Sequence, residues 1–445
     1  MDTLTLLRAG KLAGSRRLNL ACGLTEFPPE IYDLADTLEI LDLSGNTLSS
    51  LPDDFGRLPK LRVLFCSNNQ FTELPAVLGQ CPQLSMVGFK ANQIRHVPAA
   101  ALTPALRWLI LTDNQISELP TELGQCTQLQ KLMLAGNQLQ TLPITMAACT
   151  QLELLRIAAN RFTELPVWLF TLPRLAWLAY AGNPCCEHDE MAAVTQNPIT
   201  EIGWHELYIQ QQLGEGASGV IHQATFQQNA MAQHKHNVAV KLFKGELTSD
   251  GLPRSEMTAC ISAGAHPNLI AIHGKVIDHP DGALGLVMAL VDPEFRNLAG
   301  PPSLESCTRD IYASDTTFKL NTIISIAHAI ASAAQHLHSA GVMHGDLYAH
   351  NILHNDAGDC LLGDFGAASF VISTDLAQAH ALQRIEVRAF ACLLAELLAR
   401  CELSDEAPGI LIKLSVLQQR SAHSNSATRP LFAEIAQTLA ALKSC

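Results

Sequence analysis

A short hydrophobic frame recurs through the first half of the chain and constrains its fold more than any other feature. The frame is L-x-x-L-x-L-x-x-N-x-L, with other apolar residues at some of the leucine positions. Its asparagines are Asn46, Asn69, Asn92, Asn114, Asn137, Asn160 and Asn183, spaced by 23 residues with a single step of 22. A Leu-Pro or Val-Pro pair follows the copies, at residues 51–52, 74–75, 97–98, 119–120, 142–143 and 165–166. Repetition at this period predicts stacked units, because one unit cannot bury its own apolar face.

These copies resemble the leucine-rich repeats over roughly residues 15 to 184. The resemblance implies an α/β solenoid whose short parallel strands form a concave sheet. The leucines are expected to point inward, and each Asn amide to hydrogen-bond the backbone of a neighbouring turn. Leu18–Cys22 is interpreted as a degenerate first repeat that caps the solenoid, and Pro184 as the start of the opposite cap. The solenoid with its caps is assigned to residues 1–190.

The concave face is the expected binding surface of the solenoid. Because side chains alternate along a strand, the residues on either side of each inward leucine should lie on this face. The pairs are Ile40/Asp42, Val63/Phe65, Met86/Gly88, Trp108/Ile110, Lys131/Met133, Leu154/Arg156 and Trp177/Ala179. Such an apolar set, with two tryptophans, favours a bound protein partner. The alternative is that the second half of the chain, or a second copy, covers the face.

The second half begins with a glycine-rich turn. Residues 187–203 are polar and break the repeat period, which predicts a linker at 191–203 and a second domain at 204–445. Near the start of that domain, a turn between two expected strands fits the pattern G-x-G-x-x-G-x-V. The matching residues are Gly214, Gly216, Gly219 and Val220. Glycines at this spacing let a backbone approach phosphates, but the pattern alone is a weak signal.

Further motifs follow in a fixed order. Val238-Ala239-Val240-Lys241 ends an apolar strand in a lysine, and Glu256 stands at the head of an expected helix. Later come His344-Gly345-Asp346 with Asn351, and then Asp364-Phe365-Gly366. The ordered set resembles the motifs of the protein kinases over about residues 204 to 445. The resemblance implies an α+β bilobal domain that uses ATP and Mg²⁺.

The same resemblance implies catalytic roles for three residues. Lys241 would hold the α- and β-phosphates of ATP, and Glu256 would pair with Lys241. Glu246 is the second choice for that partner, because Glu256 lies one residue further from His266 than expected. Asp346 would accept or orient the proton of the attacking hydroxyl group.

The remaining expected site residues hold the metal and the nucleotide. Asn351 and Asp364 would bind Mg²⁺. Met288 would line the back of the adenine pocket. The full expected nucleotide-binding set is Leu213, Gly214, Gly216, Gly219, Val220, Ala239, Lys241 and Met288.

Departures from the kinase pattern bear on function, and one of them is that no residue clearly supplies the arginine that would anchor a peptide-substrate segment, although Arg384 and Arg388 are nearby. Gly345 replaces the usual Arg of the catalytic loop, so regulation through a phosphorylated activation loop is not expected. Tyr348 replaces the Lys usual in serine/threonine kinases, and Glu386 stands where Asp is usual. The stretch that follows Asp364 is short and contains no A-P-E motif, so much of the usual peptide-substrate platform is missing.

Charge and composition indicate which partners and which cellular location to expect. The formal net charge of −13 at pH 7 disfavours nucleic acid and anionic membranes as partners. No basic start followed by a long apolar stretch opens the sequence, and later apolar stretches are too short to span a bilayer, so neither a signal peptide nor membrane insertion is expected. The 13 cysteines include no C-x-x-C pair, which favours a reducing, cytoplasmic location.

The sequence therefore predicts an ATP-dependent protein kinase, of the serine/threonine type, whose leucine-rich repeats recruit a protein. Two alternatives remain. One is a scaffold that binds ATP without turnover, suggested by the short stretch after Asp364. The other is a kinase for a small-molecule hydroxyl group, because H-G-D-x-x-x-x-N is also similar to the loop of small-molecule phosphotransferases.

Overall fold

The computed structural model describes residues 2–216, 218–227, 235–245, 247–371, 375–402 and 408–443. Internal contacts divide the chain into a first unit, Met1–Leu175, and a second unit, Ala176–Cys445. This boundary differs from the predicted one, because the strand of the last repeat belongs to the second unit.

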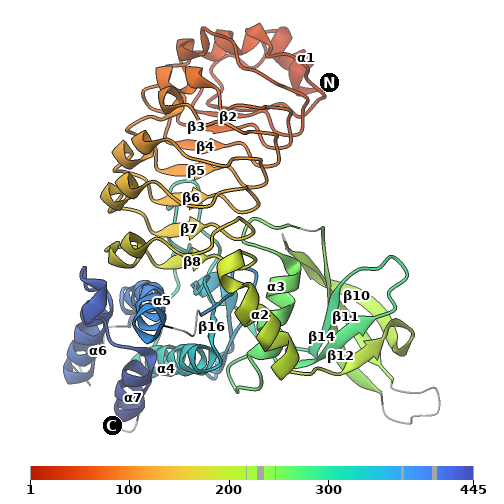
Figure 1. The fold of residues 1–445 in the computed structure, drawn as a ribbon, viewed down its shortest axis with the longest axis vertical. Helices are drawn as coiled ribbons and strands as arrows, with labels where there is room; N and C mark the ends of the chain where they lie inside the picture. Colours follow the sequence, from red (N-terminus) through yellow and green to blue (C-terminus); the bar gives the residue numbers. More distant parts are fainter. Residues whose placement is uncertain are drawn as a thin grey trace. The chain divides into compact units, whose positions relative to one another are not determined.

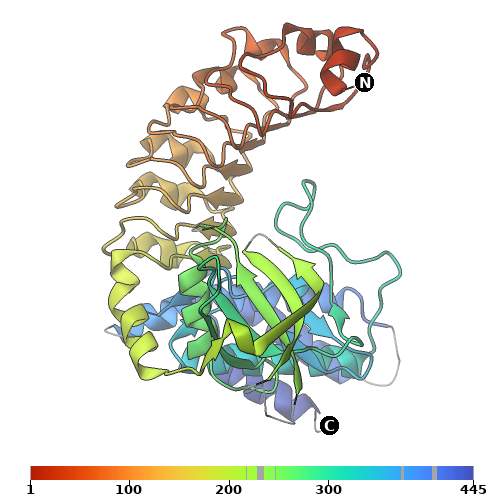
Figure 2. The ribbon, with the colours of Figure 1, turned by 90° about the vertical axis from the view of Figure 1, so that its right-hand side faces the viewer.

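The first unit is a solenoid of parallel strands. Each strand pairs in parallel register with the next, so that Leu41 lies opposite Leu64 and Leu64 opposite Val87. The strands are β1 (Arg17–Asn19), β2 (Ile40–Asp42), β3 (Val63–Phe65), β4 (Met86–Gly88), β5 (Trp108–Ile110), β6 (Lys131–Met133) and β7 (Leu154–Arg156). Figure 1 shows them stacked one above another, and Figure 2 shows that the stack follows an arc. The predicted solenoid with a parallel concave sheet is confirmed.

Short 3₁₀-helices form the other side of each repeat. They are η1 (Pro29–Leu34), η2 (Phe55–Arg57), η3 (Ala76–Gln80), η4 (Ala99–Ala101), η5 (Thr121–Gln125), η6 (Ile144–Ala148) and η7 (Val167–Thr171). In η3 to η7 the residue before the helix is the proline of the Leu-Pro or Val-Pro pair. Proline suits this place because its φ is fixed and the N–H it lacks would have no partner within the helix. Helix α1 (Thr3–Arg8) precedes the first repeat and is capped by Asp2.

A ladder of asparagines joins neighbouring repeats. The side-chain oxygen of Asn69 accepts the N–H of Leu48 at 2.9 Å, and its amide donates to the carbonyls of Leu43 at 2.9 Å and Cys66 at 3.2 Å. Equivalent bonds occur at Asn46, Asn92, Asn114, Asn137 and Asn160. Each bond satisfies a backbone group that would otherwise be buried without a partner. The predicted structural role of this column is confirmed at these positions.

The second unit opens with the strand of the last repeat, β8 (Trp177–Ala179), followed by helix α2 (Pro184–Gln196) and strand β9 (Glu201–Gly203). Strand β9 pairs in parallel with β13 (Ile272–Ile277). The residues predicted to form a linker, 191–203, therefore end a helix and add a strand to the sheet of the following domain.

The smaller lobe of that domain is a sheet with strand order β10-β11-β12-β14-β13-β9. Its remaining strands are β10 (Leu207–Glu215), β11 (Gly219–Phe226), β12 (His236–Phe243) and β14 (Gly285–Ala289), which form antiparallel pairs. Helix α3 (Pro253–Ser262) lies in sequence between β12 and β13. The apolar core of the sheet includes Leu207, Ala224, Val240 and Val287.

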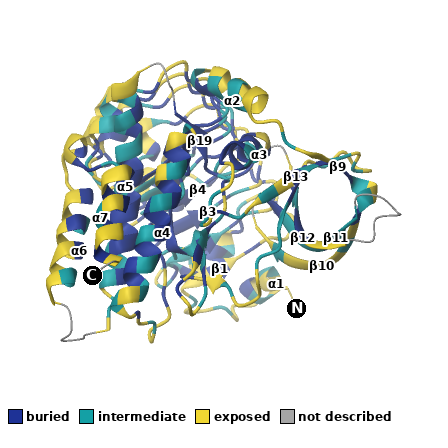
Figure 3. Cartoon of the chain, turned by 90° about the horizontal axis from the view of Figure 1, so that it is seen from below, coloured by how far each residue is buried: buried dark blue, intermediate teal, exposed yellow. Residues whose placement is uncertain are grey.

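The larger lobe is mainly helical. Its helices are α4 (Leu320–Ser339), α5 (Leu376–Leu398), α6 (Pro408–Ser421) and α7 (Phe432–Lys443), with η9 (Ala349–Asn351) and η10 (Ser426–Thr428). Short strands pair as β15 (Arg296–Asn297), β17 (Ile352–His354) and β18 (Cys360–Leu362), and as β16 (Val342–Met343) with β19 (Ser369–Phe370). Figure 3 shows much of α4 in the buried colour, whereas α6 is largely exposed.

The burial of α4 follows the sequence period. Ile323, Ile326, Ile330, Ala334 and Leu337 recur every three or four residues and are all buried, which places one face of the helix in the core. Among the residues that the structure describes, no helix is both long and apolar enough to span a membrane. The predicted bilobal α+β domain is confirmed.

Candidate active site

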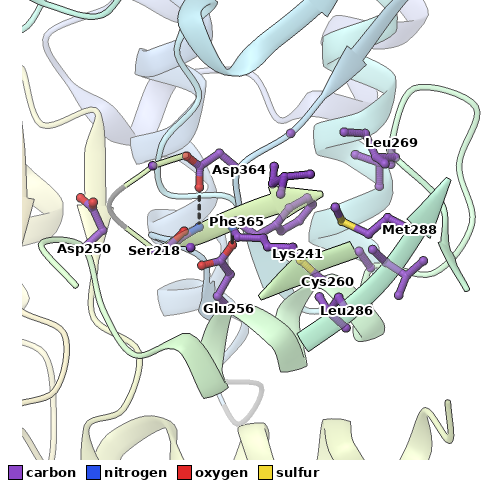
Figure 4. Close-up of a pocket in the computed structure, with 18 of the residues that line it drawn as sticks. Ser218, Lys241, Asp250, Glu256, Cys260, Leu269, Leu286, Met288, Asp364 and Phe365 are labelled. Atoms are coloured by element: carbon purple, nitrogen blue, oxygen red, sulfur yellow. Dashed lines mark hydrogen bonds and ion pairs between the residues drawn. The ribbon is translucent and has the colours of Figure 1, made fainter. Parts of the chain in front are cut away.

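One cavity of the second unit gathers several of the predicted site residues. Its wall includes Gly216, Ser218, Gly219, Ile221, Lys241, Thr248, Asp250, Glu256, Cys260, Leu269, Ile272, Leu286, Met288, Asp364 and Phe365. Figure 4 shows Lys241, Glu256 and Asp364 toward one end of the cavity and Leu269, Leu286 and Met288 toward the other. A polar end beside an apolar end suits a ligand that has a charged part and a flat apolar part.

An ion pair crosses the polar end of the cavity. Lys241 on β12 donates through Nζ to Oε1 of Glu256 on α3, and the two side chains are only 12% and 2% exposed. Burial alone would lower the pKa of Lys241, but the negative charges of Glu256 and Asp364 outweigh it and raise that pKa. Lys241 therefore stays protonated beside two carboxylates. Glu246, the second choice of partner, lies outside the described residues.

The glycines of the glycine-rich turn are of two kinds, one that close packing requires and two that it does not. A Cβ added to Gly219 would lie 2.4 Å from the carbonyl oxygen of Leu242, so close packing against β12 requires glycine there. A Cβ added to Gly214 or Gly216 would meet no described atom within 4 Å. Packing against the described residues therefore does not explain these two glycines. Open space over a turn backbone is what a phosphate group needs in order to approach it.

The structure corrects one predicted residue of this region. Ile221, Lys241 and Leu286 lie directly opposite one another on three neighbouring strands, so their side chains share the face that lines the cavity. Val220 belongs to the opposite face, because side chains alternate along β11. Counting the G-x-G-x-x-G-x-V frame from Gly219 places its apolar position at 221, so the sequence contained the signal for Ile221.

Two more predicted nucleotide-binding residues differ in how the structure places them. Met288 lines the cavity, and its Cα partner on β12 is Ala239. Leu213 is 47% exposed near the end of β10. The residues Leu213, Gly214, Val220 and Ala239 are not among the described residues that form the cavity wall.

The expected catalytic loop is held by its own polar side chains. Asn351 donates from Nδ2 to Oδ2 of Asp346 at 2.8 Å and to the carbonyl oxygen of Asp346 at 2.9 Å. The imidazole of His344 lies with Nε2 2.9 Å from the carbonyl oxygen of Gly363, and its Nδ1 accepts the N–H of Asp346 at 3.3 Å. These bonds fix the orientation of the Asp346 carboxylate.

A second carboxylate stands beside this loop. The N–H of Gly363 donates to the carbonyl oxygen of Asn351 at 2.9 Å, which brings Asp364 next to Asn351. Asp364 adopts φ 56°, a left-handed conformation that is unusual for a residue other than glycine and is often found at functional sites. The carboxylate and amide oxygens at these two positions are the hard ligands that Mg²⁺ prefers. The donor set therefore fits the predicted metal.

Gly345 replaces the usual arginine for a steric reason. It adopts φ 72°, and an added Cβ would lie 2.4 Å from the carbonyl oxygen of Ala367 and 2.9 Å from that of Leu178. The N–H of Gly345 donates to Oε1 of Glu386 on α5 at 2.7 Å. Oε2 of the same carboxylate lies 2.6 Å from Nε2 of His338 on α4. Burial would raise the pKa of Glu386, but hydrogen bonding to His338 and to Gly345 outweighs burial and lowers it.

Known proteins match the two halves of the chain separately. A family model described as "Protein tyrosine and serine/threonine kinase" matches residues 207–407. Two models of leucine-rich repeats match residues 36–79 and 104–162. These three matches fall on the segments where the repeat frame and the ordered motifs lie.

Individual relatives match parts of the second half. Fibroblast growth factor receptor 1 of Pleurodeles waltl is 27% identical over 199 residues, which are 43% of this chain and 24% of the receptor. Tyrosine-protein kinase hopscotch of Drosophila melanogaster is 27% identical over 197 residues, 43% of this chain and 15% of that protein. A probable serine/threonine-protein kinase of Arabidopsis thaliana is 28% identical over 104 residues, 23% of this chain and 16% of that protein. The chain thus spans a quarter or less of each relative.

Proposed function

We propose, on the premise that this chain fuses leucine-rich repeats to a domain of the protein tyrosine and serine/threonine kinase family, that it transfers the γ-phosphate of ATP to a hydroxyl group of a protein. The observation that carries the proposal is the buried Lys241–Glu256 ion pair in a cavity that also contains Asp364. A cationic side chain held between carboxylates at the polar end of an open cavity provides a fixed site for phosphate oxygens.

Each residue of the site has a role in this proposal. Lys241 binds the α- and β-phosphates, and Glu256 keeps Lys241 in place. Asn351 and Asp364 hold Mg²⁺, which supplies positive charge to the transferring phosphoryl group. Asp346 accepts or orients the proton of the acceptor hydroxyl, and its hydrogen bond from Asn351 keeps the carboxylate aimed at that proton.

The proposed acceptor is a serine or threonine of a protein bound by the solenoid. The kinase family includes both tyrosine and serine/threonine enzymes, so acceptor type is part of the proposal. Support for recruitment comes from the concave strands of the first unit, where Trp108 and Ile110 are half-buried. Lys131 Nζ lies 4.3 Å from the centre of the Trp108 ring, which adds a cationic rim to an apolar patch. Tethering through the solenoid raises the local concentration of substrate and offsets a reduced substrate platform.

A second candidate function is phosphorylation of a small-molecule hydroxyl group. The observation that favours it is the short connection between Gly366 and α5, which begins at Leu376. In such an enzyme the acceptor needs no peptide platform. The two proposals share the same phosphate site and differ only in the acceptor.

The proposed location is a reducing cytoplasm, which is the location expected from the cysteine spacing.

The test is transfer of labelled γ-phosphate by purified full-length protein with Mg²⁺. Wild type is compared with Asp346→Asn. Each is tested with two acceptors, the protein itself and a generic basic protein, and phosphoamino-acid analysis of the labelled product follows. Label on serine or threonine from wild type, reduced at least about 100-fold in the variant, is the expected result. Label on tyrosine would overturn the acceptor type. ATP binding without labelled protein leads to a screen of hydroxyl-bearing metabolites, and label found there would replace protein transfer by the second candidate.

A further inference from the structure

The strand of the last repeat contacts the catalytic loop directly. Trp177 on β8 is 1% exposed, and its ring stacks on that of Tyr348 with centroids 4.1 Å apart and planes 5° from parallel. Its Nε1–H donates to the carbonyl oxygen of Leu347 at 3.0 Å. Leu347 follows Asp346 in the chain. Of the two readings of the concave face, an outside protein was favoured and cover by the second half of the chain was the alternative. At Trp177 the structure shows the alternative, because the side chain is buried against the loop that carries the proposed catalytic aspartate.

A second contact joins the last repeat to the segment after Asp364. The hydroxyl of Tyr180 donates to the carbonyl oxygen of Phe370 at 2.7 Å. The side-chain oxygen of Ser369 accepts the N–H of Tyr180 at 2.9 Å and that of Ala181 at 3.2 Å. Ser369 and Phe370 form β19, whose partner strand β16 leads into His344. Tyr180 therefore fixes the strand that follows the metal-site carboxylate.

A third contact runs through α2 to α3. Glu190 on α2 accepts the N–H of Gly182 through Oε1 at 2.8 Å and the hydroxyl of Ser255 through Oε2 at 3.1 Å. Ser255 precedes Glu256, the partner of Lys241. One carboxylate thus connects the turn after the last repeat to the helix that supports the ion pair.

The far side of the catalytic loop is anchored independently. The ring of His350 lies 5.0 Å from that of Tyr348, and Nδ1 of His350 lies 2.7 Å from Oδ1 of Asp310. The backbone N–H of His350 also donates to Oδ2 of Asp310 at 3.2 Å. The loop is held at both flanks, by Trp177 on one and by Asp310 on the other.

We propose that Trp177 and Tyr180 are positioning residues for phosphoryl transfer, so that the last repeat is part of the catalytic machinery and supports the site in place of the long segment that this chain lacks after Asp364. This inference rests on the proposed kinase function. The described connection after Gly366 is short, and Tyr180 and Ala181 of the last repeat add hydrogen bonds to those it makes through the pairing of β19 with β16. The last repeat thereby holds the loop that presents Asp346, without touching the reacting atoms.

The magnitude of the expected effect follows from geometry. A single hydrogen bond is a small part of the stability of a folded domain, so loss of the Trp177 donor alone should leave the fold intact. Displacement of a reacting group by about 1 Å can reduce turnover on the order of 100-fold. The cavity wall contains neither Trp177 nor Tyr180 among its described residues, so ATP binding should change little. The signature is therefore a lower kcat at nearly constant KM for ATP.

The experiment measures kcat, KM for ATP and the melting temperature of full-length Trp177→Phe, Trp177→Leu, Tyr180→Phe, Tyr348→Leu and the Trp177→Leu/Tyr348→Leu double variant. Trp177→Phe keeps an aromatic ring and removes the donor, and it keeps the test informative if Trp177→Leu fails to fold. Trp168→Phe, in the neighbouring repeat, is the matched control. Amide hydrogen exchange of residues 345–351 is followed in the same proteins.

The expected result is a fall in kcat of about 10- to 100-fold in Trp177→Leu, with KM for ATP within about twofold and a smaller fall in Trp177→Phe. Exchange of residues 345–351 should rise, and the double variant should be less impaired than the product of the single effects. An unchanged kcat would overturn the positioning role, whatever the exchange shows. Absence of transfer by wild type would overturn the proposed function and the catalytic role with it. Hydrogen exchange would then decide separately whether Trp177 holds the loop.

Discussion

Glu386 accepts the N–H of Gly345 through one carboxylate oxygen, at 2.7 Å, and pairs with His338 through the other, at 2.6 Å. Helix α5 thereby fixes the turn that presents Asp346. The side chain is 1% exposed, so these two hydrogen bonds stand where the carboxylate would otherwise bond to water.

Truncation of this carboxylate should weaken both the fold and transfer. Glu386→Ala is expected to lower the free energy of unfolding by about 3 kcal/mol, because a buried N–H and a buried imidazole lose their acceptor. Transfer should fall with it, since Asp346 is no longer held. Glu386→Gln keeps one acceptor oxygen, so its free energy of unfolding and its transfer rate should lie between those of wild type and Glu386→Ala. Urea unfolding and kcat measure these effects, and a change below about 0.5 kcal/mol in Glu386→Ala would contradict the assignment.

Replacing Gly345 by the arginine that is usual at this point of the kinase catalytic loop should lower the stability of the protein. Gly345→Arg forces a side chain into a left-handed backbone, which costs about 1–2 kcal/mol, and places Cβ against the carbonyl oxygen of Ala367. Gly345→Ala should share most of this loss. The control is Gly282→Ala, where φ is 68° but no described atom lies within 4 Å of an added Cβ. Thermal unfolding should rank the position-345 variants below the control, and equal melting temperatures would contradict the steric explanation.

Neutralising Lys241 should separate stability from catalysis. Lys241→Met leaves Glu256 buried without its cationic partner, which is expected to cost roughly 3–5 kcal/mol. Transfer should fall at least about 100-fold. The double variant Lys241→Met/Glu256→Gln removes the buried charge and should recover most of the stability but none of the transfer. Recovery of both would show that Lys241 acts only through packing, and recovery of neither would show that the pair is not the source of the lost stability.

The sequence predicted the repeat strands and the site motifs because both follow local rules. Leu41 and its equivalents point inward at a fixed period, and Asn69 satisfies backbone groups of its own and the preceding repeat. The surroundings of Trp177 were not predictable in this way. Alternation along a strand indicates which face a side chain occupies, but it does not indicate what lies against that face. Tyr348, the residue stacked on Trp177, follows it by more than a hundred positions.

The segment after the last repeat was also difficult to interpret. Of the residues of α2, only Cys186 is fully buried, so the helix carries almost no apolar period. Its polar sequence indicated a linker, although Glu190 accepts hydrogen bonds from Gly182, before the helix, and from Ser255, on α3. Strand β9 is too short to show alternation, and its pairing with β13 depends on a sheet formed by later residues. The sequence showed that glycine replaces arginine at position 345, but it did not show why. The reason is tertiary, because an added Cβ would meet the carbonyl oxygens of Ala367 and Leu178.

The pH dependence of stability should carry the signature of Glu396 on α5. Burial raises the pKa of this carboxyl group from 4.5 to about 7, and the nearby charge of Asp310 adds to the shift. Between these two pH values the folded protein keeps the proton and the unfolded chain releases it, so the free energy of unfolding falls as pH rises from 4.5 to about 7. The loss attributable to this group is roughly 3 kcal/mol, at about 1.4 kcal/mol for each pKa unit.

Glu396→Gln should remove this slope, because an amide does not titrate and can still accept from the hydroxyl of Tyr312, now 3.2 Å from the carboxylate. The variant is expected to be more stable than wild type at pH 8 and nearly equal to it at pH 4.5. Glu305→Gln, on an exposed residue, is the matched control and should keep the wild-type slope. Urea unfolding at a series of pH values measures the difference. Parallel curves for wild type and Glu396→Gln would mean that Glu396 is ionised in the folded protein, and the predicted gain at pH 8 would then be absent.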